Sequence, residues 1–350
     1  MDKKILNIVT VLSSIFTVIV CVGLHFFPAL HEKEVLAAQQ EREIGNAHLI
    51  ATSTNPADVV KTDDSMDAQL KIGLPEELLE KELEIENDYI TQTVYVRFSG
   101  GVDDYFETYA IRGSCDHIAS LSYYKDGTDG VIALELDQVF ELEDSYEPGR
   151  LYLEFLSPHD VYDKVVVVDA GHGGHAPGAV RLGISEKNID LAILKQVKKL
   201  FDDGPDNIGV YYTRTTDTNP SLEQRVQLAN RSDADLFISI HNNSDSTGNF
   251  TNTSGTQVMF SESDTSEFSS RRLAQICMKN VVESLNGTDK GLLKGDRIYI
   301  IRTSEVPVAL IEVGFMTNYE ELEKLESEDY QKKAAEGIYN AVMEAFEEGY

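Results

Sequence analysis

The stretch KVVVVDAGHGGHAPGAVRLGISEKN, residues 164–188, sets the fold of the second half of the chain. Its four consecutive valines predict a strand, and this strand runs into a glycine-rich turn that contains His172. The stretch then reaches Glu186, which begins a predicted helix. A strand, a turn with an ionisable residue and a helix, in this order, are typical of an α/β domain.

Two later apolar runs also end in ionisable residues. LFISIHNN, residues 236–243, contains His241, and VALIEVGFMTN, residues 308–318, contains Glu312. In α/β folds, ligands bind in the crevice beyond the carboxyl ends of the strands. We therefore predict that these two residues join the earlier histidine and glutamate in a metal site with a base beside it.

Strand and helix patterns alternate over residues 164–348, which predicts an α/β domain with a largely parallel sheet. The predicted helices follow Ser185, span residues 222–231, pass through Cys277, and run from Ala334 to Ala345. The further predicted strands are residues 208–214, 236–241, 255–261, 297–302 (RIYIIR) and 308–313.

The amino-terminal segment, residues 1–30, is predicted to be a cytoplasmic stub and a transmembrane anchor. Ile5–Phe27 contains no acidic or basic side chain other than His25, and two lysines precede it. About 20 apolar residues suffice to cross a bilayer as a helix, and lysines before a first span favour an amino terminus on the inner side. A cleaved signal peptide is the alternative, but signal h-regions are shorter, about 7–15 residues, so we favour a retained anchor.

Two segments separate the anchor from the α/β domain. Residues 31–74 are polar and aperiodic, which predicts a linker or stalk. Residues 75–160 are predicted to be a small all-β domain, because short runs rich in β-branched and aromatic residues alternate with turn residues. A short acidic helix is predicted at the start of this domain, over Pro75–Asn87 (PEELLEKELEIEN).

The composition excludes some partners. Sixty acidic side chains against 30 basic ones give a net charge of −30, which disfavours nucleic acid and anionic lipid. The three cysteines contain no CxxC pair, so a cysteine zinc site is not expected.

The candidate site residues have the chemistry of a zinc hydrolase. Catalytic zinc takes three protein ligands from His, Glu and Asp and leaves one position for water, and His172, Glu186 and His241 supply such a set. Glu312 lies in an apolar run, where burial would raise its pKa and suit it to proton transfer. Single histidines and glutamates at such positions are more often structural, so spacing alone leaves the two interpretations nearly balanced.

A family resemblance decides between them. Residues from Lys164 to about Phe346 resemble the zinc-dependent N-acetylmuramoyl-L-alanine amidase catalytic domain, amidase type 3. The matching motifs, which occur in the family's order, are VVVDAGHGG, the EK of GISEKN, the TR and D of YYTRTTD, SLEQRVQLAN, ADLFISIHNN, SGTQVMF and IEVGFMTN. One position departs from the pattern, since Ala176 stands where the family commonly has Asp.

The resemblance implies a fold, a site and a reaction. It implies a six-stranded, mostly parallel sheet flanked by helices, with zinc held by His172, Glu186 and His241 and with Glu312 as the catalytic glutamate. The expected reaction is hydrolysis of the amide between the lactyl group of N-acetylmuramic acid and L-alanine of the stem peptide in peptidoglycan. The preceding β segment resembles the wall-binding domains of such amidases in size and place only.

Alternatives and partners follow from the same interpretation. A zinc peptidase that cleaves within stem peptides, and a catalytically silent wall-binding or activator protein, are the competing hypotheses. We expect a single-pass membrane protein with its catalytic domain on the extracytoplasmic side, secreted if the amino-terminal segment is cleaved. An activator protein is a further expected partner.

Overall fold

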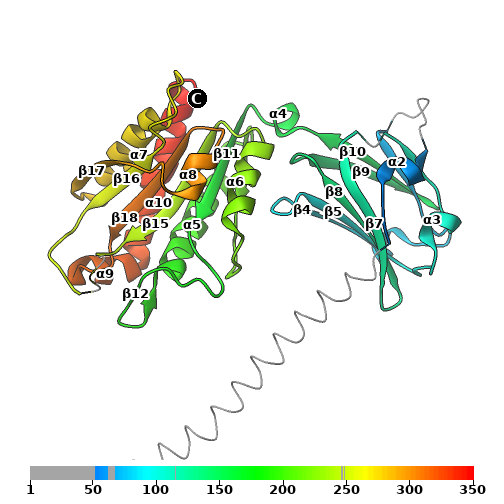
Figure 1. Ribbon diagram of the computed structural model, residues 1–350, viewed down its shortest axis with the longest axis horizontal. Coiled ribbons are helices and arrows are strands. Elements are labelled where there is room, and N and C mark those ends of the chain that lie inside the picture. Colours follow the sequence, from blue (N-terminus) through cyan, green and yellow to red (C-terminus); the bar gives the residue numbers. More distant parts are fainter. Residues whose placement is uncertain (1–51, 62–67, 115, 246, 248) are drawn as a thin grey trace, which may run out of the picture.

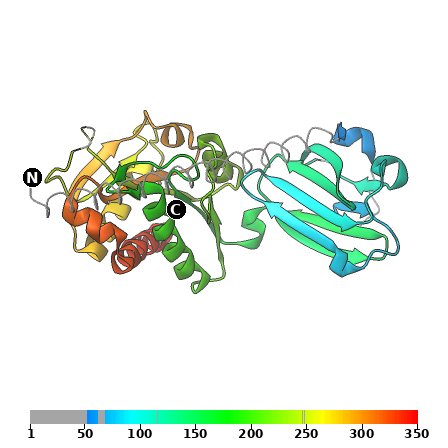
Figure 2. The same ribbon diagram turned by 90° about the horizontal axis from the view of Figure 1, so that it is seen from below.

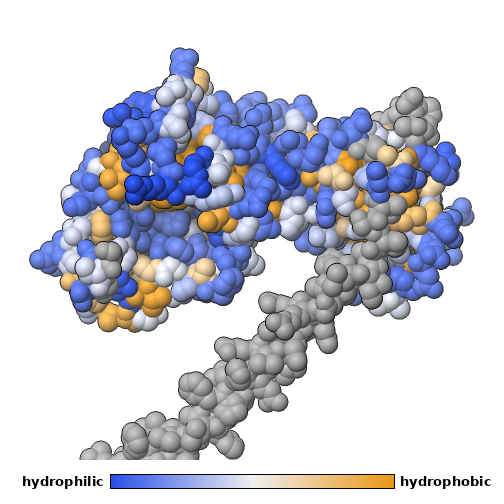
Figure 3. Space-filling model, viewed as in Figure 1, coloured by the Kyte–Doolittle hydropathy of each residue, from blue (hydrophilic) through white to orange (hydrophobic). Residues whose placement is uncertain are grey.

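The structure is a computed structural model that describes residues 52–61, 68–114, 116–245, 247 and 249–350. A β sandwich and an α/β domain are joined by the short helix α4 (Pro158–Val161) (Figure 1). Hydrophilic residues dominate the visible surface of both, in keeping with the net charge of −30 (Figure 3). Within the described ranges, no helix is long and apolar enough to cross a bilayer. The predicted anchor, Ile5–Phe27, lies outside them.

The β sandwich consists of two five-stranded sheets. Alternate side chains of the inner strands, such as Val94, Val96 and Phe98, are fully buried between the sheets. One sheet has the order β1 (Thr52–Thr54), β7 (Ile118–Asp126), β8 (Asp129–Leu136), β5 (Thr93–Ser99), β4 (Leu83–Asp88). The other has the order β2 (Val60–Lys61), β6 (Ile111–Gly113), β3 (Leu70–Gly73), β10 (Arg150–Leu156), β9 (Glu141–Glu147). Short helices α2 (Pro56–Val59) and α3 (Tyr105–Thr108) connect strands.

Two predictions for this region are wrong. The β domain begins before residue 75, the boundary predicted from the sequence. Strands β1, β2 and β3 precede residue 75 and pair with β7, β6 and β10 of the sandwich. The acidic helix predicted at Pro75–Asn87 is instead a single 3₁₀ turn, Glu80–Glu82, followed by β4. Leu83 and Ile85 alternate with glutamates and pack on the sandwich core, so pairing with β5 outweighs the helix propensity of the glutamates.

The α/β domain is built on a six-stranded, mostly parallel sheet, as predicted. Neighbouring strands are parallel except for β16 and β18, which are antiparallel. The order is β14 (Ile208–Tyr212), β11 (Lys164–Ala170), β15 (Leu236–Asn243), β18 (Val308–Phe315), β16 (Thr256–Phe260), β17 (Asp289–Lys294). A small hairpin, β12 (Val180–Arg181) and β13 (Ile184–Ser185), lies outside this sheet.

Helices cover both faces of the sheet (Figure 2). One face packs against α5 (Glu186–Asp202), α7 (Ser270–Leu285), α9 (Tyr319–Glu326) and α10 (Glu328–Glu347). The other face packs against the shorter α6 (Leu222–Arg231) and α8 (Tyr299–Thr303).

The segment RIYIIR was predicted to be a strand, and this prediction is wrong. Residues 299–303 form α8, and the sheet instead gains β17 from the segment DKGLLK. Ile300 and Ile301 are adjacent, yet both are buried in the same cluster on one face of the sheet. Successive side chains of a strand point to opposite faces, so only a helical turn directs both into that cluster.

The β sandwich contributes to the core of the α/β domain. Val139 is 2% exposed and belongs to the same cluster as Val165 and Val167 of β11. Glu141 accepts hydrogen bonds from the hydroxyls of Tyr89, at 2.9 Å, and of Tyr211, at 2.5 Å. The two domains therefore share apolar packing as well as polar contacts.

Candidate metal centre

His172 is presented by a backbone turn that needs glycines. Its own φ is +59°, in the left-handed region, and it follows β11 by two residues. A Cβ on Gly171 would lie 2.2 Å from Cε1 of His241, and one on Gly178 would lie 2.5 Å from Oε2 of Glu186. Glycine at these two positions therefore allows the turn to approach the other site residues closely.

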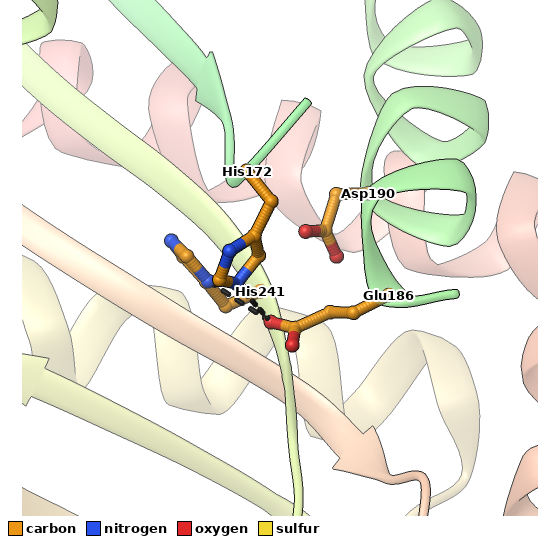
Figure 4. A group of neighbouring side chains, drawn as sticks. All are labelled: His172, Glu186, Asp190 and His241. Atoms are coloured by element: carbon orange, nitrogen blue, oxygen red, sulfur yellow. Dashed lines mark hydrogen bonds and ion pairs between the residues drawn. The ribbon is translucent and has the colours of Figure 1, made fainter. Parts of the chain in front are cut away.

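Glu186 joins the two histidines. It is the first residue of α5, and its Oε1 lies 3.0 Å from Nε2 of His172 and 3.0 Å from Nδ1 of His241 (Figure 4). Its other oxygen accepts a hydrogen bond from the backbone N–H of Ala179 at 2.8 Å. The preceding Ser185 is the N-cap residue of α5, and its side chain makes no capping hydrogen bond. The structure thus brings together the three residues predicted to bind metal.

The electrostatics of this group suit a cation. Burial alone would raise the pKa of Glu186, but hydrogen bonds from His172 and His241 hold it well below its usual range. Burial would lower the pKa of His241, whereas its hydrogen bond to Glu186 and the nearby carboxylates Asp190 and Glu312 raise it to about 9. The site therefore favours positive charge near the carboxylates.

Asp190, one helical turn after Glu186, is a fourth member of the group that the sequence analysis missed. The potential ligand atoms of His172, Glu186, Asp190 and His241 all lie within 4.8 Å of one another. One signal was available in the sequence, since Asp190 is four residues after Glu186 and adjacent to buried Ile189. Residues at positions i and i+4 share a helix face.

Glu312 lies beside the group but is not part of it. Its strand, β18, pairs with β15, and Glu312 is opposite His241 in the register. Its Oε2 is buried and has no hydrogen-bond partner among the described residues. Burial raises the pKa of Glu312 to about 7, with repulsion from Glu186 adding to the effect and His241 opposing it.

Two buried arginines hold the turn in place. Arg225 donates from Nη1 to Asp169 at 2.5 Å and from Nη2 to the carbonyl of His172 at 2.5 Å. Arg214 donates to the carbonyls of Ala170 and Gly171 at 2.9 and 2.6 Å. Because these donors are bonded to the protein itself, a structural role suits both arginines.

An open cavity of about 330 Å³ lies against both histidines. Ala176, Pro220, Leu222 and Ile300 contribute apolar surface to its wall. This cavity gives a substrate group access to His172 and His241.

The fold and the site define an α/β enzyme with a candidate metal centre beyond the carboxyl ends of its parallel strands. Comparisons with known proteins name the family. Residues 166–344 match the family of N-acetylmuramoyl-L-alanine amidases, so the chain belongs to this family.

Individual relatives agree with this assignment. The uncharacterized protein YqiI of Bacillus subtilis is 42% identical over 180 residues, which cover 51% of this chain and 83% of YqiI. The amidase LytC of the same organism is 32% identical over 184 residues, 52% of this chain but only 36% of LytC. A crystal structure of an N-acetylmuramoyl-L-alanine amidase from Clostridium difficile 630 is 32% identical, with a TM-score of 0.50, and the match covers 53% of this chain and 98% of that one. The α/β domain is therefore a peptidoglycan amidase domain.

Proposed function

We propose that the α/β domain hydrolyses the amide bond between the lactyl group of N-acetylmuramic acid and L-alanine with a zinc ion held by His172, Glu186 and His241. The observation that carries this proposal is the convergence of both imidazoles on one oxygen of Glu186, at 3.0 Å each. Two imidazoles and one carboxylate are a donor set that catalytic zinc uses. When bound, zinc supplies Lewis acidity, which activates water and polarises the scissile carbonyl.

Glu312 is the proposed proton carrier. Its unpartnered, buried oxygen is free to accept a proton from the attacking water. As the C–O bond forms and the C–N bond breaks, the same carboxyl gives this proton to the departing amino group of L-alanine. A pKa of about 7 allows Glu312 to act both as a base and as an acid near neutral pH.

We also propose that the protein is anchored in the membrane by residues 5–27 and acts on the extracytoplasmic side. The charge-free apolar run and the preceding lysines support this proposal. Fractionation of cells that express the full chain tests it, since a retained anchor keeps the protein in the membrane fraction in high salt. Recovery of a shortened soluble form would instead show cleavage.

The reaction is tested by incubating the full chain, purified in detergent, with peptidoglycan and identifying the products by mass spectrometry. We expect intact stem peptides with a free L-alanine amino group, lost on chelation and restored by zinc. Cuts within the stem would assign the site to a peptidase. If the zinc-loaded protein releases no product, this would indicate that an activator is needed.

The role of Glu312 is tested with Glu312→Gln, which keeps the side-chain volume and removes the base. We expect kcat to fall by about 10²–10⁴-fold, with zinc content unchanged. The exposed Glu320→Gln is the matched control and should retain full activity. Loss of zinc in Glu312→Gln would show that Glu312 holds the metal instead.

A further inference from the structure

Asp190 is a buried carboxylate whose hydrogen bonding is incomplete. The residue is 0% exposed, and its Oδ1 accepts a hydrogen bond from Nδ2 of Asn242 at 2.7 Å. Its Oδ2 is buried without any hydrogen-bond partner among the described residues. A buried carboxylate in this state is costly, because its second oxygen has no hydrogen bond.

Among the described residues, no cationic side chain forms a salt bridge with Asp190. Its helix contributes a second carboxylate, Glu186, and the neighbouring strand end contributes His241. Arg214 is committed to the carbonyls of Ala170, Gly171 and Lys187. The described residues therefore contain no arginine or lysine in a salt bridge with Asp190.

The position of Asp190 suggests what does compensate it. In Figure 4 its carboxylate points from α5 toward the space that His172, Glu186 and His241 share. Its ligand oxygen lies within 4.8 Å of the corresponding atoms of those three residues. This distance allows either direct coordination after a small shift or a contact through one water.

We propose that Asp190 is a fourth protein group of the metal centre and that its charge sets the affinity for the ion. This inference rests on the proposed zinc function. The ion would balance two buried carboxylates instead of one, and Asn242 would hold Asp190 in place through its side-chain amide. Groups that support metal ligands typically change the metal affinity about 10–100-fold when they are mutated.

The variant Asp190→Asn removes the charge and keeps both the shape and an oxygen that can accept from Asn242. Its zinc affinity is measured on the full chain in detergent by competition with a chromogenic chelator. Asp202→Asn, on the exposed end of the same helix, is the matched control. Glu186→Gln is the control for loss of a ligand.

We expect Asp190→Asn to bind zinc about 10–100-fold more weakly than the wild type, while Asp202→Asn is unchanged. This loss corresponds to about 1.4–2.8 kcal/mol at 1.4 kcal/mol for each tenfold change. Without zinc, the thermal midpoint of Asp190→Asn should equal or exceed that of the wild type, since a neutral amide replaces a fully buried carboxylate. The zinc-induced rise in the midpoint should shrink accordingly.

A purely structural Asp190 gives the opposite pattern. The zinc-free midpoint would then fall, because the bond with Asn242 weakens, while zinc affinity stays the same, and this result would overturn the proposal. The absorption spectrum of the cobalt-loaded protein adds a readout of the coordination sphere, which a structural role would leave unchanged. If the wild type and Glu186→Gln bind zinc equally poorly, the proposed zinc function itself fails, which separates the two failures.

Discussion

The buried pair of Arg225 and Asp169 gives a prediction about how the proposed metal site is supported. Arg225 is 3% exposed and Asp169 is fully buried. Burial would raise the pKa of Asp169, but Arg225 and the hydroxyls of Ser239 and Thr213 hold it below its usual value. The pair is bonded to the turn that carries His172, because Arg225 also donates a hydrogen bond to the carbonyl of His172.

Replacing Arg225 with Met keeps much of the side-chain volume and leaves Asp169 as a buried charge without its cation. Removal of one partner from a buried pair costs about 3–5 kcal/mol. Asp169 keeps hydroxyl hydrogen bonds from Thr213 and Ser239, each at 2.6 Å, which favours the lower part of that range. For a loss of about 3–4 kcal/mol, at about 2–4 °C for each kcal/mol in a domain of this size, the thermal midpoint should fall by roughly 6–16 °C.

The assay is thermal unfolding followed by circular dichroism in the presence of a chelator, so that zinc makes no contribution. A double-mutant cycle with Asp169→Asn isolates the pair, because the asparagine side chain of that variant can still accept hydrogen bonds without a charge. We expect the double variant to lose much less than the sum of the single losses. Arg297→Met, on an exposed loop, is the control. Additive losses, or a midpoint for Arg225→Met equal to that of the control, would refute the reasoning.

Two further predictions concern packing and pH. Val139→Asp places a charge in the cluster shared by the β sandwich and β11. We therefore expect the free energy of unfolding to fall by at least about 3 kcal/mol and the α/β domain to be proteolysed faster. An unchanged thermal midpoint for that domain would show that it folds independently of the sandwich. Asp264 accepts from the backbone N–H and the hydroxyl of Ser270 at 2.6 and 2.7 Å, at the start of α7. Burial would raise the pKa of Asp264, but hydrogen bonds from Ser266 and Ser270 lower it. The stabilisation of the folded state by Asp264 is therefore present above the ordinary carboxyl pKa of about 4 and is lost as the pH falls through the folded-state pKa. Asp264→Ala should therefore lower the urea midpoint at pH 7 by the equivalent of about 1 kcal/mol, a difference that shrinks below about pH 4; a difference independent of pH would contradict this assignment.

Errors of the sequence analysis fall where local pattern and tertiary pairing compete. The glutamates around Leu83 favour a helix locally, but β5 offers Leu83 and Ile85 a partner strand and an apolar core. RIYIIR is rich in β-branched residues, yet both Ile300 and Ile301 are needed in one cluster, which a helical turn provides. In each case burial of apolar side chains outweighed a propensity of less than about 1 kcal/mol for each residue.

The parallel α/β architecture could be predicted from the sequence alone, and so could three residues that the structure brings together, His172, Glu186 and His241. The alternation of strand and helix patterns indicated the architecture. The spacing of the three residues left a metal site and structural roles nearly balanced, and the family resemblance decided between them. The folded chain was needed to show that Asp190 joins this group with an unpartnered oxygen, and that the β sandwich completes a core cluster of the α/β domain. Both features depend on contacts between residues far apart in the chain, and no local spacing encodes which buried polar atom is left without a partner.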